Sequence, residues 1–116
     1  AFQLEPDGVT PYIGSVLSYY QACFPDSLDV DEDGNLYQAM SLQGRYVVLN
    51  SLGNPFAQIV IPERVTGHML QTTHSAIIPG TNQIIVCASD MQGGQGTALY
   101  TALVPAKAWN GYYQFQ

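Results

Sequence analysis

Short apolar runs alternate along the chain with clusters of Gly, Pro, Asn and Asp, and no apolar stretch with a 3.6-residue period stands out. The clusters contain Asp-Gly and Gly-Asn pairs, which are typical of turns between β-strands. The pattern predicts strands over residues 1–4, 28–30, 35–40, 45–50, 56–61, 76–78, 83–88, 97–104 and 112–115. Residues 15–23 are the best candidate for a helix, but they suit a strand as well. The chain is therefore predicted to be almost entirely β.

Two segments of the chain repeat each other. Residues 27–37 and 75–85 each contain an apolar strand, a turn cluster and a second strand, at a constant offset of 48 residues that predicts turns of equal length. The third strands, 45–50 and 97–104, follow at a looser offset of about 52 residues. Four strands per unit of roughly 40 to 50 residues are typical of β-propeller blades. The expected units are the end of one blade (1–23), a second blade (24–71) and a third blade (72–116).

The predicted blades are too few to close a propeller. About two and a half blades are predicted, whereas propellers typically contain four to eight. An arc of this size would leave open strand edges and an incomplete core. We therefore expect complementary blades from another chain or from a segment that lies outside this sequence. The chain begins with Ala1 and not with Met, which favours a processed product or a fragment.

Composition narrows the classes of function. Hydrophobic residues make up 47% of the chain. Charged residues make up 10%, whereas about 25% is typical of globular proteins. High hydrophobicity and low charge exclude a disordered chain. Nine acidic and three basic residues give a net charge of −6, so neither nucleic acid nor an anionic membrane surface is an expected partner. No run of apolar residues is long enough for a transmembrane helix, and no signal peptide is visible. The low charge and many Tyr residues weakly favour a secreted protein. Cys23 and Cys87 are expected to be buried free thiols, with a disulfide between them as the alternative.

One acidic turn is similar to the start of an EF-hand loop. Asp29, Asp31 and Asp33 alternate before Gly34, but Met40 occupies the twelfth position, where an EF-hand requires a bidentate Glu. The segment is predicted to be a solvated hairpin turn, with a weak surface calcium site as the alternative.

The segment 24–37, with the sequence FPDSLDVDEDGNLY, resembles the signature F-P-D-G-L-x-V-D-x-x-G-N-L-W/Y of the gluconolactonase–regucalcin family of six-bladed propellers. Three other segments are similar to family motifs in the same order: 1–8 (AFQLEPDG), 44–50 (GRYVVLN) and 72–76 with 83–88. The resemblance covers nearly the whole chain and corresponds to the C-terminal portion of the family. The chain departs from the signature at Ser27, where the family usually has Gly.

The resemblance implies a site for one divalent cation, often calcium, on the propeller axis. The Asp of the family's P-D-G motif is one of the metal ligands, and its position in this chain is Asp26. A carboxylate at the start of an innermost strand suits calcium, which prefers hard oxygen ligands. The family's Glu and Asn ligands have no match in this chain. The alternative for Asp26 is a strand-start residue that binds nearby backbone amides.

Two histidines are candidates for a substrate pocket. His74 lies 48 residues after Asp26, so the repeat predicts that it faces the same channel one blade further on. His68 lies in the predicted loop between blades, where loops can cover the mouth of a channel. The alternative for both residues is a structural role.

The family resemblance implies a metal-dependent hydrolase of lactones or related small cyclic esters. In such an enzyme the cation would polarise the carbonyl group, and Asp26 would hold the cation and take a proton from the attacking water. The alternative is a propeller that only binds a partner, because this fold supports many unrelated functions.

Overall fold

The computed structural model describes residues 1–21 and 24–111. Its strands are β1 (Phe2–Leu4), β2 (Pro11–Gly14), β3 (Phe24–Val30), β4 (Leu36–Ser41), β5 (Arg45–Leu49), β6 (Pro55–Val60), β7 (Gln71–Ile77), β8 (Gln83–Ser89) and β9 (Thr97–Leu103). The described part contains one 3₁₀ helix, η1 (Pro62–Thr66), and no α-helix. The predicted all-β class is therefore confirmed. Residues 15–21 form neither a helix nor a strand, and the strand predicted over 112–115 lies outside the described residues.

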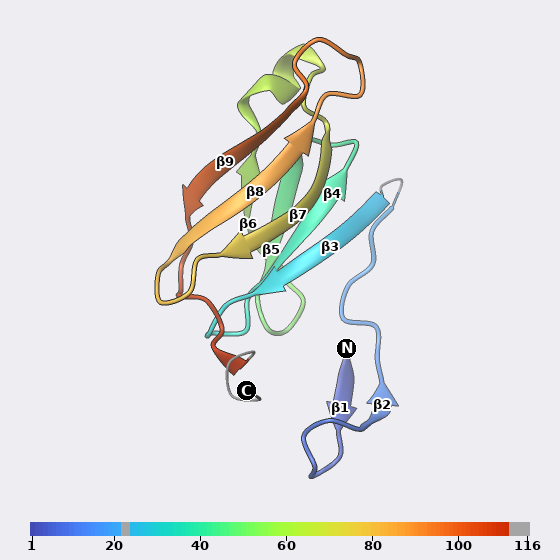
Figure 1. Cartoon of the computed structure of the whole chain (residues 1–116). Helices are drawn as coiled ribbons and strands as arrows, with labels where there is room; N and C mark the ends of the chain where they lie inside the picture. The colour runs from blue at the N-terminus through green and yellow to red at the C-terminus, as the bar shows by residue number, and fades with distance from the viewer. Residues whose placement is uncertain (22–23, 112–116) are drawn as a thin grey trace.

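The strands form three antiparallel sheets (Figure 1). A two-stranded hairpin contains β1 and β2, a four-stranded meander runs β3-β4-β5-β6, and a three-stranded meander runs β7-β8-β9. Consecutive strands pair with each other because short turns join them, which is the connection expected for propeller blades. The 3₁₀ helix η1 crosses from β6, at the outer edge of one meander, to β7, at the start of the next.

The main core lies between the two meanders. Its buried members are Tyr37, Ala39, Tyr46, Val48, Ile61, Met69, Ile77, Ile84, Val86, Ala88 and Val104. Most of these residues come from β4 and β5 on one side and from β7 and β8 on the other, whereas Ile61, Met69 and Val104 lie in the connecting segments. Burial of this apolar surface is what holds the two meanders together.

Burial differs between the innermost and the central strands. Every described residue from Tyr37 to Ser41 in β4 is buried, whereas β3 is exposed or half-buried along its whole length. β3 is the edge strand of its sheet and pairs with β4. In Figure 1 it also lies beside β7, and the β1–β2 hairpin projects away from both meanders. The exposed surface of β3 therefore corresponds to the inner edge of the first meander.

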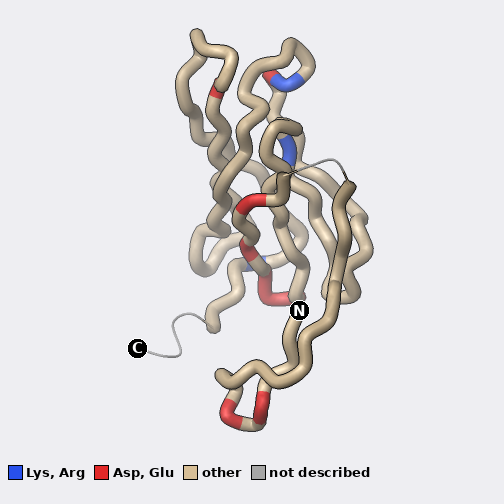
Figure 2. The backbone as a smooth tube through the Cα atoms, turned by 90° about the vertical axis from the view of Figure 1, so that its right-hand side faces the viewer, with Lys and Arg blue, Asp and Glu red and all other residues tan. Residues whose placement is uncertain are grey.

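Acidic segments are spread along the backbone, and two of them lie in the turn between β1 and β2 (Figure 2). Basic segments are few, in agreement with the net charge of −6. Within residues 1–21 and 24–111, no helix has the length and apolar character that crossing a membrane requires. Cys87 is a half-buried free thiol, and Cys23 lies outside the described residues.

Candidate functional site

The innermost strands β3 and β7 carry the same irregularity near their first residues. The pairing of β3 with β4 shifts between Pro25 and Leu28, so that two residues on β3 lie opposite one on β4. The pairing of β7 with β8 shifts between Thr72 and Ser75 in the same way. A β-bulge of this kind bends a strand and re-aims its side chains, and bulges are common next to active sites.

The positions of the two bulges differ from the predicted offset of 48 residues between the repeats. They are 47 residues apart, and the turn after β3 has five residues between paired positions (31–35) whereas the turn after β7 has six (78–83). The prediction of turns of equal length is therefore wrong by one residue. Asp26 is equivalent to Thr73, and His74 is equivalent to Ser27.

Asp26 lies in the bulge of β3 with its side chain exposed. The bulge backbone is held from β4, because Nε2 of Gln38 donates hydrogen bonds to the carbonyl oxygens of Asp26 at 2.7 Å and of Ser27 at 3.2 Å. Within the part of the chain that the structure describes, no group donates a hydrogen bond to the Asp26 carboxylate. The expected alternative, a carboxylate that binds nearby backbone amides, is therefore absent among the described residues.

His74 lies in the bulge of β7, and its ring is exposed. Its backbone is fixed by the neighbouring meander: the hydroxyl of Tyr46 donates to the carbonyl oxygen of His74 at 2.7 Å and to that of Cys87 at 2.8 Å. Burial raises the pKa of Tyr46 far above its ordinary value, so this hydroxyl remains a donor at neutral pH. The contact positions the His74 backbone while its imidazole stays available for a ligand.

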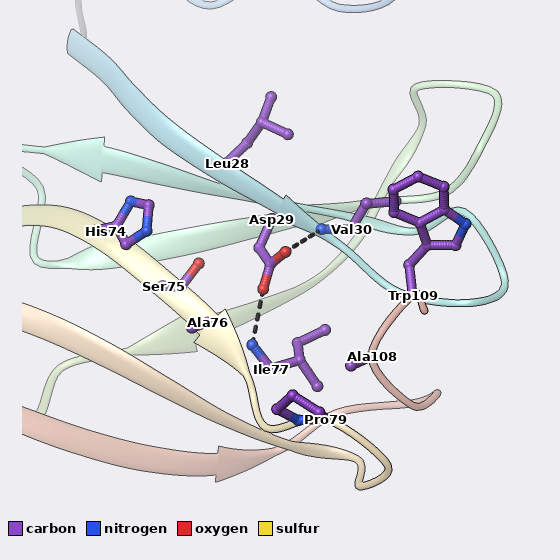
Figure 3. Close-up of a pocket in the computed structure, with 10 residues that line it drawn as sticks. All are labelled: Leu28, Asp29, Val30, His74, Ser75, Ala76, Ile77, Pro79, Ala108 and Trp109. Carbon is purple, nitrogen blue, oxygen red and sulfur yellow. Dashed lines mark hydrogen bonds between the residues drawn. The ribbon is translucent and has the colours of Figure 1, made fainter. Parts of the chain in front are cut away.

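Asp29 joins the two innermost strands. Its carboxylate accepts hydrogen bonds from the amide of Ile77 on β7 and from the amide of Val30, both at 2.8 Å (Figure 3). Asp29 belongs both to the strand predicted over 28–30 and to the acidic segment predicted to be a solvated turn, and neither prediction included this role. Strand alternation placed Asp29 in β3 but could not show that β7 lies beside it.

A cavity of about 240 Å³ opens between β3 and β7. Its lining residues are Leu28, Asp29, Val30, His74, Ser75, Ala76, Ile77, Pro79, Ala108 and Trp109 (Figure 3). The structure thus brings His74 and Asp29 to one cavity, whereas Asp26 and His68 are not among its lining residues. The hydroxyl of Ser75 is buried beside His74 and has no hydrogen-bond partner among the described residues. A buried polar atom without a partner is a position where a water molecule or a ligand atom can bind.

His68 lies between η1 and β7, as predicted for a loop between blades. Its Nδ1 is 2.8 Å from a carboxylate oxygen of Asp90, which follows β8. The amino-acid sequence contains no signal for this pair, because the two residues are 22 positions apart in loops of irregular structure.

The acidic turn after β3 differs from the prediction. Asp31 is 1% exposed, not solvated. Its carboxylate accepts hydrogen bonds from the amides of Asp33 and Asn35, from the side-chain amide of Asn35 and from the hydroxyl of Tyr37. Burial and the bond to Asp31 raise the pKa of the Tyr37 phenol far above its ordinary value, so it donates at every physiological pH. With its carboxylate occupied by these donors, Asp31 serves as the internal anchor of the turn.

The described residues offer few side chains that could bind a metal ion together. Among residues 1–21 and 24–111, no group of three or more His, Cys, Asp or Glu side chains converges as a metal centre would require. Asp26 offers an exposed carboxylate without a partner in that part of the chain, which fits a single ligand to a hard cation. The remaining ligands would have to come from backbone oxygens, water or other residues.

The bulged innermost strands, the two packed meanders and the cavity between them define an all-β arrangement of propeller-blade type. The chain is 50% identical to lactonase drp35 of Staphylococcus aureus strain bovine RF122 over 97% of its own length, and 45% identical to lactonase drp35 of Staphylococcus saprophyticus over 94%. It is therefore homologous to lactonase drp35. The chain spans about a third of the length of these curated relatives, 36% and 35% respectively. No family model matches the chain.

Proposed function

We propose that this chain is part of a metal-dependent lactonase, an enzyme that hydrolyses lactones or related small cyclic esters. The observation that supports the proposal most strongly is the 50% identity to a lactonase over 97% of the chain. A second support is the exposed carboxylate of Asp26, which lies in a bulge of an innermost strand and has no described partner. The resemblance to the gluconolactonase–regucalcin family implies calcium as the cation, and the carboxylate of Asp26 is a ligand type that calcium accepts.

In this proposal Asp26 contributes one ligand to the cation and also takes a proton from the attacking water. A bound divalent cation supplies polarisation of the ester carbonyl and stabilisation of the oxyanion that develops there. The exposed ring of His74 orients the substrate in the cavity between β3 and β7. Asp29 keeps these two strands in register through its bond to the amide of Ile77.

The chain works together with further blades in this proposal. It covers about a third of its relatives, and β3 presents an exposed edge that a neighbouring blade would cover. Activity should therefore require the complementary blades, either from the same polypeptide or from a partner chain.

The proposal is tested by the substitution Asp26→Asn in the chain assembled with its complementary blades. Calorimetric titration with calcium should show affinity weakened by at least about 10-fold, since the loss of even an outer-shell partner typically costs that much. Hydrolysis of a simple lactone such as γ-butyrolactone should fall in parallel, while the melting temperature measured without calcium stays unchanged. Asp33→Asn is the matched control: Asp33 is exposed on the same strand–turn unit, and its substitution should leave calcium affinity intact.

Equal calcium affinities of the wild type and Asp26→Asn would remove Asp26 from the metal site. A wild-type protein that binds calcium but hydrolyses no lactone would favour the alternative, a propeller that only binds a partner. His74→Ala separates substrate from metal: it should raise KM or lower kcat and leave calcium affinity nearly unchanged, because it removes a substrate contact and not a ligand.

A further inference from the structure

Strand positions of the two meanders are equivalent because each hairpin has the same pairing beyond its bulge. The second paired position beyond the bulge joins Asp29 to Tyr37 in the first meander, and Ala76 to Ile85 in the second. Along the ladders from there, four positions of β4 and β5 correspond to four positions of β8 and β9. Tyr37, Ala39, Tyr46 and Val48 are equivalent to Ile85, Cys87, Leu99 and Thr101, respectively.

These equivalent positions differ in burial. The four residues of the first meander are at most 2% exposed, because the second meander covers them in the main core. Their equivalents in the second meander are exposed or half-buried, and Leu99 is 71% exposed. In Figure 1 this side of the second meander is turned toward the viewer, since β7, β8 and β9 lie in front of the first meander. We call it the outer face, and its residues are Ala76, Ile85, Cys87, Leu99, Thr101 and Leu103.

The contact between the two meanders contains two polar connections that the outer face does not repeat. The carboxylate of Asp29 accepts a hydrogen bond from the amide of Ile77 at 2.8 Å. The hydroxyl of Tyr46 donates to two carbonyl oxygens of the second meander. At the equivalent positions the outer face has Ala76 and Leu99, whose side chains form no hydrogen bonds. The side chains at these two positions can therefore contribute only apolar contact to a partner.

The outer face is also uncharged. None of its residues is Asp, Glu, Lys or Arg. It contains a hollow of about 110 Å³, lined by His74, Ser75, Ala76, Ile85, Cys87 and Leu99. An exposed apolar surface of this kind is typical of a contact with another apolar surface, and it gives a charged partner nothing to pair with.

The described contact shows what kind of surface covers such a face. The second meander covers the first with branched and small apolar side chains, which are those of Ile77, Ile84, Val86 and Ala88. The same arrangement can continue across the outer face, because the strand positions are equivalent. The chain spans 36% of lactonase drp35 of Staphylococcus aureus strain bovine RF122, so most of that relative lies outside the matching region.

We propose that the outer face binds a further blade of the same polypeptide, through a strand that presents branched and small apolar side chains. This inference rests on the part of the proposed function that requires complementary blades. The docked blade lies beside the candidate site, because His74 lines both the hollow in the outer face and the cavity between β3 and β7. Docking therefore adds a wall to the surroundings of His74.

The test is alkylation of Leu99→Cys by iodoacetamide in the chain assembled with its complementary blades. Val65→Cys is the matched control, because Val65 is 85% exposed and lies in η1, outside the outer face. Each rate is divided by that of the unfolded variant and is measured by mass spectrometry of the peptide, which separates it from Cys23 and Cys87. Leu99→Cys should react at least about 10-fold more slowly, since a covered thiol reacts only when the contact opens. Equal rates would overturn the proposal.

A charge on the outer face should weaken the assembled protein. Leu99→Asp places a carboxylate without a partner in an apolar contact, so its melting temperature should be at least about 4 °C below that of the wild type. Val65→Asp should melt within about 1 °C of the wild type, as surface substitutions usually do. A Leu99→Asp variant as stable as Val65→Asp would overturn the proposal. The alkylation result remains decisive if Leu99→Asp fails to fold.

Photocrosslinking identifies the occupant. With Leu99→benzoylphenylalanine, irradiation should give a product with the mass of one polypeptide, crosslinked to a segment outside residues 1–116. A product of doubled mass would mean that a second copy covers the outer face, and a crosslink to a different chain would mean a separate partner. Either result would overturn the proposed occupant.

These measurements do not depend on lactone hydrolysis. A protein that hydrolyses lactones but alkylates Leu99→Cys and Val65→Cys equally would overturn the docking surface and leave the proposed activity standing. A protein that protects Leu99→Cys but hydrolyses no lactone would overturn the activity and leave the docking surface standing.

Discussion

The β3–β4 and β7–β8 hairpins have nearly the same ladder and the same bulge, but their turns are closed in different ways. In the first turn the buried carboxylate of Asp31 accepts four hydrogen bonds. In the second, which is one residue longer, the hydroxyl of Thr81 donates to the carbonyl of Ile78 at 2.9 Å and accepts from the amide of Gln83 at 3.1 Å. A repeated sequence pattern therefore produced similar strands but turns of different length.

The segment after β9 explains the difference. The amide of Glu32 donates to the carbonyl of Lys107 at 2.9 Å, and Asp31 forms an isolated bridge with Ala108. This segment covers the first turn and excludes water from Asp31. The second turn receives two backbone bonds, from the amide of Val104 to the carbonyl of Asn82 at 2.9 Å and from the amide of Ala108 to the carbonyl of Thr81 at 3.1 Å, but it contains no buried carboxylate. Burial of a carboxylate is stable only when donors surround it, and Asn35 and Tyr37 supply them.

The largest expected effect is that of Asp31→Ala. It removes a charged acceptor and leaves the buried hydroxyl of Tyr37 without its partner, so the free energy of unfolding should fall by on the order of 3 kcal/mol. Urea denaturation of the assembled protein measures this. Asp33→Ala, an exposed neighbour in the same turn, should stay within about 0.5 kcal/mol of the wild type. Similar losses in both variants would mean that the turn is solvated after all.

A smaller loss is expected from Tyr46→Phe. This change keeps the ring in the core but removes the hydroxyl that donates to the carbonyls of His74 and Cys87 across the two meanders. The cost should be about 1 to 2 kcal/mol, with the overall fold retained. Because the bond also fixes the His74 backbone, KM for a lactone should rise in the same variant. A stable variant with unchanged KM would show that the hydroxyl of Tyr46 does not position His74 for substrate binding.

Much of this hairpin comparison could be predicted from sequence, and most of the failures come from contacts between segments that are far apart in the chain. The strands and turns follow from alternation and turn residues, which are local properties. The burial of Asp31 depends on Lys107 and Ala108, more than 70 residues away. The His68–Asp90 pair likewise joins two loops, and only the folded chain shows it. The one-residue error in register arose because sequence comparison cannot show which of two turns contains an additional residue.

Thr81→Ala should have a modest effect and sharpens the contrast with Asp31. It removes two local bonds of a neutral hydroxyl at a half-buried position, and water can replace them. The expected cost is about 0.5 to 1 kcal/mol by the same denaturation experiment. A loss as large as that of Asp31→Ala would show that the two turns contribute equally, in spite of their different burial.

The smallest effect on stability is expected at the bulges themselves. Asp26 and Thr73 occupy equivalent positions, but the hydroxyl of Thr73 lies 3.1 Å from Sγ of Cys87, whereas the Asp26 carboxylate is exposed and has no partner among the described residues. Asp26→Asn should therefore change the free energy of unfolding by less than about 0.5 kcal/mol when calcium is removed with a chelator. In saturating calcium the wild type should be more stable than Asp26→Asn, because calcium that binds only the folded state stabilises the folded protein. Melting curves of both proteins, with and without calcium, measure this difference. If calcium stabilises the wild type and Asp26→Asn equally, Asp26 binds no metal and its exposed carboxylate is not a ligand.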